Sequence, residues 1–510
     1  MAKFLGEFNS FYKQKNLIYP TIFLLVLCYG YEIINFTLSI DEEKVNYRGD
    51  DYSPWFVQGR IGIGIIKWAI LNATYIPYLT TVLAAVLMAI SALIWVFIIN
   101  KLALDKLSSV SMVIFIGMYL ALPSVNASFF SFSTYNLEIA LGMLIVPISI
   151  FYIIKSTGNK QINIFWASAF LAVSLCLYQA FITVFILGII ICLSLLLYFE
   201  QKENIKKFIF NAIVTFSLGL TFFYLTEKLF QFFWPSSGYV DNFIRWGNAP
   251  LKVIISDLYR EMYQKFCNLN ILDNILLFSL VTIVMILILI LIHQRSINEK
   301  CFLLIIFLTL PILPFSLCIV TGNMMPYRTL LALPLFVGFV MFFLIHLLEK
   351  IVWVKHIFII IVFLLLFVQI QSLNMIFYGD NVRYKMDENI GNSISEDILT
   401  NSKGDLSKPV VFIGEYSHQL NPRIIKFDTL GASFFEWDNG NNVRIHNFLR
   451  ILGYKFLEPS AEMIEESING IKIDEIPNWP VEGSIIVNPN YIIVKLSNPS
   501  GSWYYVNLPH

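Results

Sequence analysis

The chain has few charged residues and no excess of either sign. Only 14% of its 510 residues are Asp, Glu, Lys or Arg, whereas 57% are hydrophobic, and the mean hydropathy is +0.69. The 35 basic and 35 acidic residues cancel, which argues against nucleic-acid binding and against a polybasic membrane tether. This composition is typical of a protein that crosses a membrane several times.

Several chemical signatures are missing. The six cysteines lie mostly in apolar runs without metal-ligand spacing, so we expect no structural disulfide and no metal site. The polar residues after 378 contain no G-x-G-x-x-G, P-loop, H-E-x-x-H or nucleophile elbow. We expect no cofactor, and the sequence leaves open whether a divalent cation assists. The first apolar run is too long for a signal-peptide core and lacks a small-residue cleavage site, so we expect it to remain as a spanning helix.

What the chain does contain is long apolar runs. They cover residues 17–38, 77–99, 108–124, 134–154, 162–178, 180–199, 208–230, 271–292, 301–320, 328–348 and 356–377. By length they predict about eleven transmembrane helices. The run 162–199 is too long for one span, so we split it at Tyr178-Gln179. The alternative, one tilted helix plus an interfacial piece, would invert every later loop.

The distribution of Lys and Arg predicts the orientation. With the N-terminus in the cytoplasm, every inside loop is basic, for example around Lys101, Lys155, Lys206 and Lys300. An odd number of helices then places everything after residue 377 outside. No inside loop is long enough for a cytosolic catalytic domain that would bind a nucleotide sugar.

Acidic residues gather directly after the first apolar run. Asp41, Glu42 and Glu43 are consecutive, and Asp50 and Asp51 follow. Residues 54–71 then form an amphipathic stretch that predicts a helix lying along the membrane surface. Together they would hold carboxylates at the membrane edge, where a general base could act on a lipid headgroup. The alternative is a solvated acidic loop.

Two later external segments carry polar groups. A loop containing Asp241 leads into residues 251–266, which predict a second surface-lying amphipathic helix. Arg328 lies at the mouth of the tenth predicted span, where an arginine is either a membrane anchor or a phosphate ligand.

From residue 378 the composition changes to that of a soluble α/β domain. We expect a helix over 381–400, a buried strand in P-V-V-F-I-G-E, helices over 442–452 and 460–469, and two paired strands near the C-terminus. The predicted domains are therefore a membrane domain over 1–377 and a soluble domain over 378–510.

Four motifs carry a family resemblance. They are the helix ending in S-I-D-E-E followed by W-x-x-x-G-R, L-Y-Q-A at residues 177–180, P-Y-R at residues 326–328, and G-D-N-V-R-Y-K-M-D at residues 379–387. In order and placement the chain resembles the phage-type, serotype-converting O-antigen glucosyltransferases (the glucosyltransferase II family). These are similar to other GT-C transferases, whose helices hold a polyprenyl-phosphate sugar and whose first external loop supplies an Asp or Glu as base.

The resemblance implies a function and a set of site residues. The chain would be an inverting transferase that moves a sugar, expected to be glucose, from a polyprenyl-phosphate donor to an O-antigen or lipid-linked glycan acceptor. The reaction would take place at the periplasmic side of the bacterial inner membrane. Asp41 is the first candidate for the base and Glu42 the second. The candidate binding groups are Arg60, Tyr178, Gln179 and Arg328.

Restraint by the preceding helix favours Asp41 and Glu42 over later acids, because a base must lie within about 3 Å of the acceptor hydroxyl. We expect Glu43 to be solvated. Glu43, Asp50, Asp51 and Asp241 are secondary candidates. An O-antigen polymerase or ligase, a flippase or transporter, and a non-enzymatic scaffold remain alternatives. The sequence gives neither the sugar and its linkage nor the acceptor.

Overall fold

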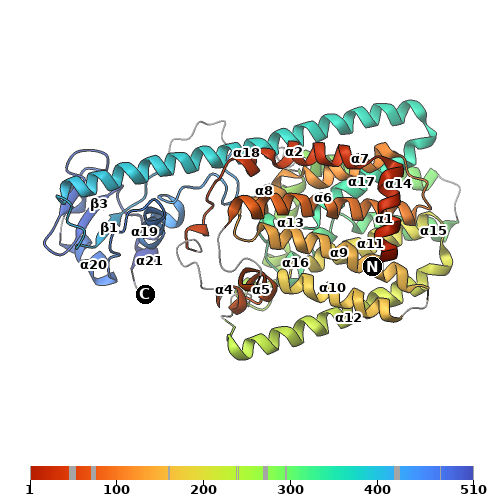
Figure 1. Cartoon of the computed structure of the whole chain (residues 1–510), viewed down its shortest axis with the longest axis horizontal. Helices are drawn as coiled ribbons and strands as arrows, with labels where there is room; N and C mark the ends of the chain where they lie inside the picture. Colours follow the sequence, from red (N-terminus) through yellow and green to blue (C-terminus); the bar gives the residue numbers. More distant parts are fainter. Residues whose placement is uncertain are drawn as a thin grey trace. The chain divides into compact units, whose positions relative to one another are not determined.

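The chain folds into two units of different character. The computed structural model (Figure 1) describes residues 2–44, 53–69, 76–158, 161–236, 238, 241–267, 274–292, 296–417, 425–470 and 472–508. Unit 1 comprises Met1–Ile34 and Tyr52–Asn374, and unit 2 comprises Asn35–Asp51 and Met375–His510. The short segment 35–51 therefore belongs to the C-terminal unit, a grouping that the sequence did not indicate.

The regular secondary structure that is described in unit 1 consists of helices. In chain order it contains α1 (Ala2–Lys15), α2 (Ile18–Ile34), α4 (Ser53–Val57), α5 (Ile61–Ala69), α6 (Pro77–Leu102), α7 (Ser109–Leu120), α8 (Pro123–Phe130), α9 (Asn136–Ser156), α10 (Gln161–Leu177), α11 (Phe181–Tyr198), α12 (Lys202–Phe233), α13 (Leu251–Cys267), α14 (Asn274–Ile292), α15 (Ile297–Thr309), α16 (Ser316–Thr321), α17 (Leu333–Leu347) and the first part of α18 (Val352–Asn401). Short 3-10 turns, including η1 (Asp241–Phe243) and η3 (Tyr327–Thr329), join some of them.

The described residues hold six helices that are long and apolar enough to cross a membrane, or eight if two bent pairs each count as one span. The pairs are α7 with α8, bent by 54°, and α15 with the 313–321 segment, bent by 47°. Three shorter apolar helices are α2, α10 and α17. The chain is therefore a polytopic membrane protein with several apolar helices.

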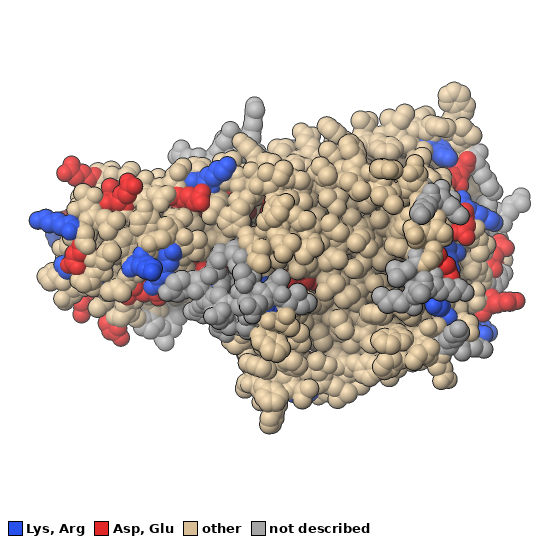
Figure 2. All heavy atoms as spheres, viewed as in Figure 1, with Lys and Arg blue, Asp and Glu red and all other residues tan. Residues whose placement is uncertain are grey.

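The surface of unit 1 agrees with this assignment. Figure 2 shows a broad face of unit 1 that is nearly without charged side chains, and charged residues gathered at one end, at the right of the view. Large apolar side chains point outward, as for Phe232 on α12 and Trp353 on α18, which expose 83% and 84% of their surface. Exposing this apolar surface to water would be unfavourable, whereas contact with lipid would not be.

Small residues allow the inner helices of unit 1 to approach closely. A Cβ atom added to Gly142 on α9 would lie 2.0 Å from the ring of Phe181, and one added to Gly188 on α11 would lie 2.5 Å from the ring of Trp95. Such contacts replace the hydrophobic driving force that is missing between helices in lipid.

Most predicted helices are present. The break at Tyr178-Gln179 is confirmed, because α10 ends at Leu177 and α11 begins at Phe181. The separate helices expected over 356–377 and 381–400 are wrong, because α18 runs without interruption from Val352 to Asn401. Gly379 is the weakest helix former at the expected break, and a single glycine costs only about 1 kcal/mol.

Unit 2 contains a small mixed sheet with helices around it. The strands β1 (Val410–Ile413), β2 (Ile485–Val487) and β3 (Ile492–Lys495) lie in the order β1-β3-β2, with β1 parallel and β2 antiparallel to β3. The helices are α19 (Asn442–Ile451), α20 (Ala461–Asn469), α21 (Gly501–Asn507) and the end of α18. A buried cluster forms the core of the sheet: Val411, Ile413, Ile464, Ile473, Tyr491, Ile493 and Trp503.

The G-D-N-V-R-Y-K-M-D motif forms a buried polar network on α18. The Arg383 side chain is fully buried and pairs with Asp380 at 2.7 Å and with Asp387 at 3.3 Å. Asp380 also accepts the backbone N–H of Gly431, and Asp387 accepts the hydroxyl of Ser433. The motif therefore ties α18 to the loop 431–434 within unit 2.

The same motif holds the segment that carries the acidic cluster. Arg383 donates to the carbonyl oxygen of Leu38 at 2.9 Å, and Asn381 donates to the carbonyl of Phe36 and to the hydroxyl of Thr37, each at 3.1 Å. Backbone groups that follow the end of α2 are thus satisfied by side chains from α18. The network therefore fixes the position of the backbone that leads into Ser39 and the acidic cluster.

Candidate active site

The three consecutive acids have three different environments. The side chain of Asp41 is 58% exposed, whereas Glu42 and Glu43 expose 1% and 0% of their surface. The expectation that Glu43 is solvated is wrong, because a buried arginine binds its carboxylate inside unit 2.

Glu42 is used to cap a turn. Its carboxylate accepts the backbone N–H of Ser39 at 2.9 Å, while its own N–H donates to the carbonyl of Ser39 at 3.1 Å. The S-I-D-E sequence therefore forms half of a capping box, in which the acid reaches back three residues. This role binds one carboxylate oxygen of Glu42 and lowers its value as a base.

Arg444 of α19 binds three carboxylates. Its Nη1 donates to Glu43 at 2.6 Å, and its Nη2 donates to Asp41 at 3.0 Å and to Asp438 at 2.7 Å. The Arg444 side chain is only 2% exposed. Burial alone lowers the pKa of Arg444, but the carboxylates of Glu43 and Asp41 outweigh it, so the pKa is raised and the guanidinium stays charged.

One arginine cannot neutralise three carboxylates. The buried carboxylate, that of Glu43, holds its proton most readily. Burial raises the pKa of Glu43 to about 7, against a smaller lowering by Arg444. Asp41 and the cation Lys44 are the other charged groups that affect this pKa. Glu43 therefore changes its charge near neutral pH, next to the carboxylate of Asp41.

Asp41 has a strained backbone as well as an accessible carboxylate. Its φ of +79° lies in the left-handed region, which few residues other than glycine adopt. Such strain costs about 1–3 kcal/mol and persists only where surrounding contacts enforce it. The contacts here are the Arg444 pair and the turn made by Ser39 and Glu42. Among the three acids, Asp41 is therefore the one whose carboxylate is both held in place and accessible.

In unit 1 the W-x-x-x-G-R motif ends a helix. The N–H of Arg60 donates to the carbonyl of Trp55 at 2.8 Å, the N–H of Gly59 donates to that of Phe56 at 3.0 Å, and Gly59 has φ +73°. This is a Schellman turn, for which glycine is the preferred residue. The single surface helix expected over 54–71 is therefore wrong: α4 and α5 are separate, with the turn between them.

The turn brings Arg60 to the L-Y-Q-A motif. The Arg60 guanidinium carbon lies 4.9 Å from the centre of the Tyr178 ring and 5.8 Å from that of Trp55. Gln179 donates to the carbonyl of Gly59 at 3.0 Å. The structure thus joins Arg60, Tyr178 and Gln179, three of the four predicted binding residues, in one cluster.

A row of aromatic rings leads from this cluster to the fourth residue, Arg328. Trp55 meets the ring of Tyr135 at 6.0 Å, and Tyr135 stacks on Phe132 at 5.0 Å. The guanidinium carbon of Arg328 lies 5.5 Å from the centre of the Phe132 ring. Arginines held against aromatic faces keep their N–H groups oriented for phosphate.

Lys67 of α5 adds a further cation that the sequence interpretation missed. It pairs with the buried carboxylate of Glu138 at 3.2 Å, donates to the carbonyl of Thr134, and lies 5.7 Å from the centre of the Trp55 ring. We call Arg60, Lys67 and Arg328, with their rings, the cationic aromatic row. This row can bind an anionic group and the apolar face of a sugar.

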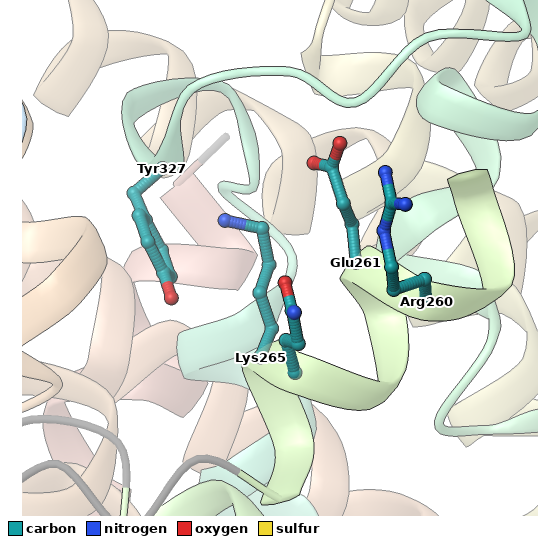
Figure 3. A pocket seen from close by; sticks show the side chains of 5 residues that line it. Arg260, Glu261, Lys265 and Tyr327 are labelled. Atoms are coloured by element: carbon teal, nitrogen blue, oxygen red, sulfur yellow. The ribbon is translucent and has the colours of Figure 1, made fainter.

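A cavity of about 260 Å³ lies beside α13, the helix expected over 251–266. Figure 3 shows Lys265 directed toward Tyr327, with Arg260 and Glu261 on the same helix; Gln264 completes the lining. The Lys265 ammonium lies 3.5 Å from the centre of the Tyr327 ring. Because Tyr327 precedes Arg328 in P-Y-R, this motif contributes to both the cavity and the cationic aromatic row.

Three further acidic candidates have no described side chain. Asp50 and Asp51 lie outside the described residues, and although Asp241 begins η1, its side chain is not described. Among the residues that the structure describes, no group of three or more His, Cys, Asp or Glu side chains is placed to hold a metal ion.

Arg444 is the main residue that sequence reasoning missed. A signal was present, because Arg444 and Phe448 are four residues apart and lie on the same face of α19, next to the buried Ile445 and Leu449. A charged residue on the apolar face of a helix indicates a buried partner.

A family model described as Glucosyl transferase GtrII matches residues 30–345, more than half of the chain. No curated protein and no solved structure matches the chain.

The raised pKa of Glu43 predicts a pH dependence of stability. Because the folded-state pKa of about 7 exceeds the ordinary value of 4.5, the stabilising effect is complete below pH 4.5 and is lost as the pH rises toward 7. The change is up to about 3 kcal/mol. We expect thermal unfolding of the full chain in detergent to show Glu43→Gln gaining stability over the parent between pH 5 and pH 8. Glu465→Gln, an exposed control, should follow the parent. Parallel curves for parent and Glu43→Gln would contradict the assignment.

Proposed function

The chain belongs to the Glucosyl transferase GtrII family, and from this premise we propose that it is an inverting transferase that adds glucose from a polyprenyl-phosphate donor to an O-antigen precursor. The family makes it a membrane glycosyltransferase. The donor, the acceptor and the periplasmic side of the reaction are part of the proposal.

The observation that carries the proposed chemistry is the environment of Asp41. An exposed carboxylate, enforced at positive φ and bound on one oxygen by a buried arginine, suits a general base. Asp41 would take the proton from the acceptor hydroxyl as that oxygen forms a bond to the anomeric carbon. The bond from this carbon to the donor phosphate oxygen breaks at the same time, and the phosphate leaves with the electron pair.

The cationic aromatic row supports a phosphate-linked donor. A leaving phosphate needs positive charge that is already in place when the bond breaks. Arg60 and Arg328 have planar guanidinium groups that match phosphate oxygens. A donor carried on a polyprenyl chain also explains why so much of the protein consists of apolar helices.

We further propose that eleven helices cross the membrane. The six long helices, the two bent pairs, and the shorter α2, α10 and α17 together make eleven spans. The shorter helices have 15 to 17 residues, near the lower limit for a span. With basic loops in the cytoplasm, this number puts the N-terminus inside and the soluble C-terminal domain, residues 378–510, in the periplasm.

Amide substitutions test the function and the base together. The purified chain in lipid nanodiscs would be given polyprenyl-phosphate glucose and a lipid-linked O-antigen unit, and glucose transfer would be measured. Asp41→Asn should reduce turnover by about 10²–10⁴-fold, because Asn tolerates positive φ but cannot take a proton. Glu42→Gln should stay within about tenfold of the parent, because a Gln oxygen still caps Ser39.

The two parts of this proposal fail in different ways. If the parent transfers no glucose from this donor, the proposed donor or acceptor is wrong. If the parent is active and Asp41→Asn turns over equally fast, Asp41 is not the base.

Two substitutions of Arg328 test whether its planar guanidinium group or only its positive charge is needed. Arg328→Lys should retain partial activity, whereas Arg328→Ala should lose about 10- to 100-fold in kcat/KM, the effect of one or two hydrogen bonds to a charged group. Lys228→Ala is a control, because it removes an exposed cation of α12 whose hydrogen bond goes to Gln231. Full activity of Arg328→Ala in the same assay would mean that Arg328 is only a membrane anchor.

A further inference from the structure

Unit 2 contributes a side chain to the environment of the proposed base. Arg444 lies beyond residue 345, where the family match ends, yet its Nη2 binds Asp41 at 3.0 Å. Asp41 and Arg444 belong to the same unit, although 403 residues separate them in the chain. Nothing in the family match gives Arg444 a role.

Arg444 is held in place by the sheet of unit 2. Its backbone N–H donates to the cap residue Asn441 at 3.1 Å. The next residue, Asn442, exchanges two side-chain hydrogen bonds with the backbone of Phe412 in β1, at 2.7 and 2.9 Å. One turn later, His446 bonds the carbonyl of Val410 at 2.8 Å. The start of α19 is thus fixed on β1, and the Arg444 side chain has a rigid base.

The guanidinium geometry matches its partners. Nη1 serves the buried Glu43, while Nη2 is shared between Asp41 and Asp438, which has a 40% exposed side chain. A single ammonium group cannot reproduce this fork. Arg444 bonds Oδ1 of Asp41, so the carboxylate has a fixed orientation while its side chain stays 58% exposed.

We propose that Arg444 is a positioning residue of the glycosyl transfer, through which the C-terminal unit fixes the orientation of the catalytic carboxylate of Asp41. The proposal rests on the proposed function of Asp41. Loss of Arg444 would let the Asp41 carboxylate rotate and would remove the cation that binds it.

The charge around Glu43 gives this arrangement a pH dependence. Three further charged groups affect the pKa of Glu43 or of Arg444, namely Asp41, Asp438 and Lys44, and Glu43 and Arg444 also act on each other. Below the point where Glu43 ionises, the guanidinium serves Asp41 and Asp438 alone. Above it, the ionised Glu43 competes with Asp41 and Asp438 for the same guanidinium.

Kinetics of the full chain with polyprenyl-phosphate glucose test the proposal. Arg444→Lys should lower kcat by about 10- to 100-fold with KM for the donor nearly unchanged, as expected for a defect in positioning a general base. Because Lys cannot orient Asp41, the pH dependence of kcat should also shift. Arg450→Lys is the matched control on the same helix, since Arg450 pairs with Glu458 at the surface, and it should behave as the parent.

A double variant separates positioning from mere stability. Asp41→Asn with Arg444→Lys should be no slower than Asp41→Asn alone, because both changes affect one catalytic step. If Arg444→Lys fails to fold, Glu43→Gln with Arg444→Gln replaces the buried ion pair by two amides that can bond each other, and the same loss of kcat is expected.

Three results would overturn the proposal. Parental kcat for a folded Arg444→Lys removes the positioning role while leaving Asp41 as the base. Losses that multiply in the double variant mean that Arg444 acts independently of Asp41. Full turnover of Asp41→Asn removes the base itself, and with it the proposed function of this carboxylate.

Discussion

Two buried arginines hold the segment that carries the acidic cluster. Arg383 and Arg444 are each at most 2% exposed, and both must be paired, since an uncompensated buried charge costs several kcal/mol. Arg383 pairs with Asp380 and Asp387 and donates to the carbonyl of Leu38. Arg444 pairs with Glu43 and Asp41. The course of residues 36–43 in unit 2 follows from these demands.

The sequence motifs of the chain form turns and hydrogen-bond networks, which place their charged side chains. W-x-x-x-G-R forms a Schellman turn, and the guanidinium group of its arginine lies near the rings of Trp55 and Tyr178. The G-D-N-V-R-Y-K-M-D motif makes the network that begins the acidic segment. In each case the backbone geometry fixes a charged group that would otherwise move, which is the requirement for an active site.

Apolar length and periodicity predicted most helices and the break after Leu177, because these features depend on neighbouring residues. The turn at Gly59 was within reach, since glycine favours positive φ. The burial of Glu43 was not, because its partner Arg444 lies 401 residues further along the chain. Nothing local separates a solvated acid from one that pairs at such a distance, and the membership of 35–51 in unit 2 was missed for the same reason.

The central claim is that unit 2 holds the acidic segment in place. Hydrogen–deuterium exchange of the full chain in detergent tests it most directly, in peptides covering residues 36–43. The account predicts slow exchange in the parent, approaching that of β1, and fast exchange in the same peptides when Arg444→Lys weakens the attachment. Exchange in the parent as fast as that of an exposed loop, or no change in the variant, would contradict it.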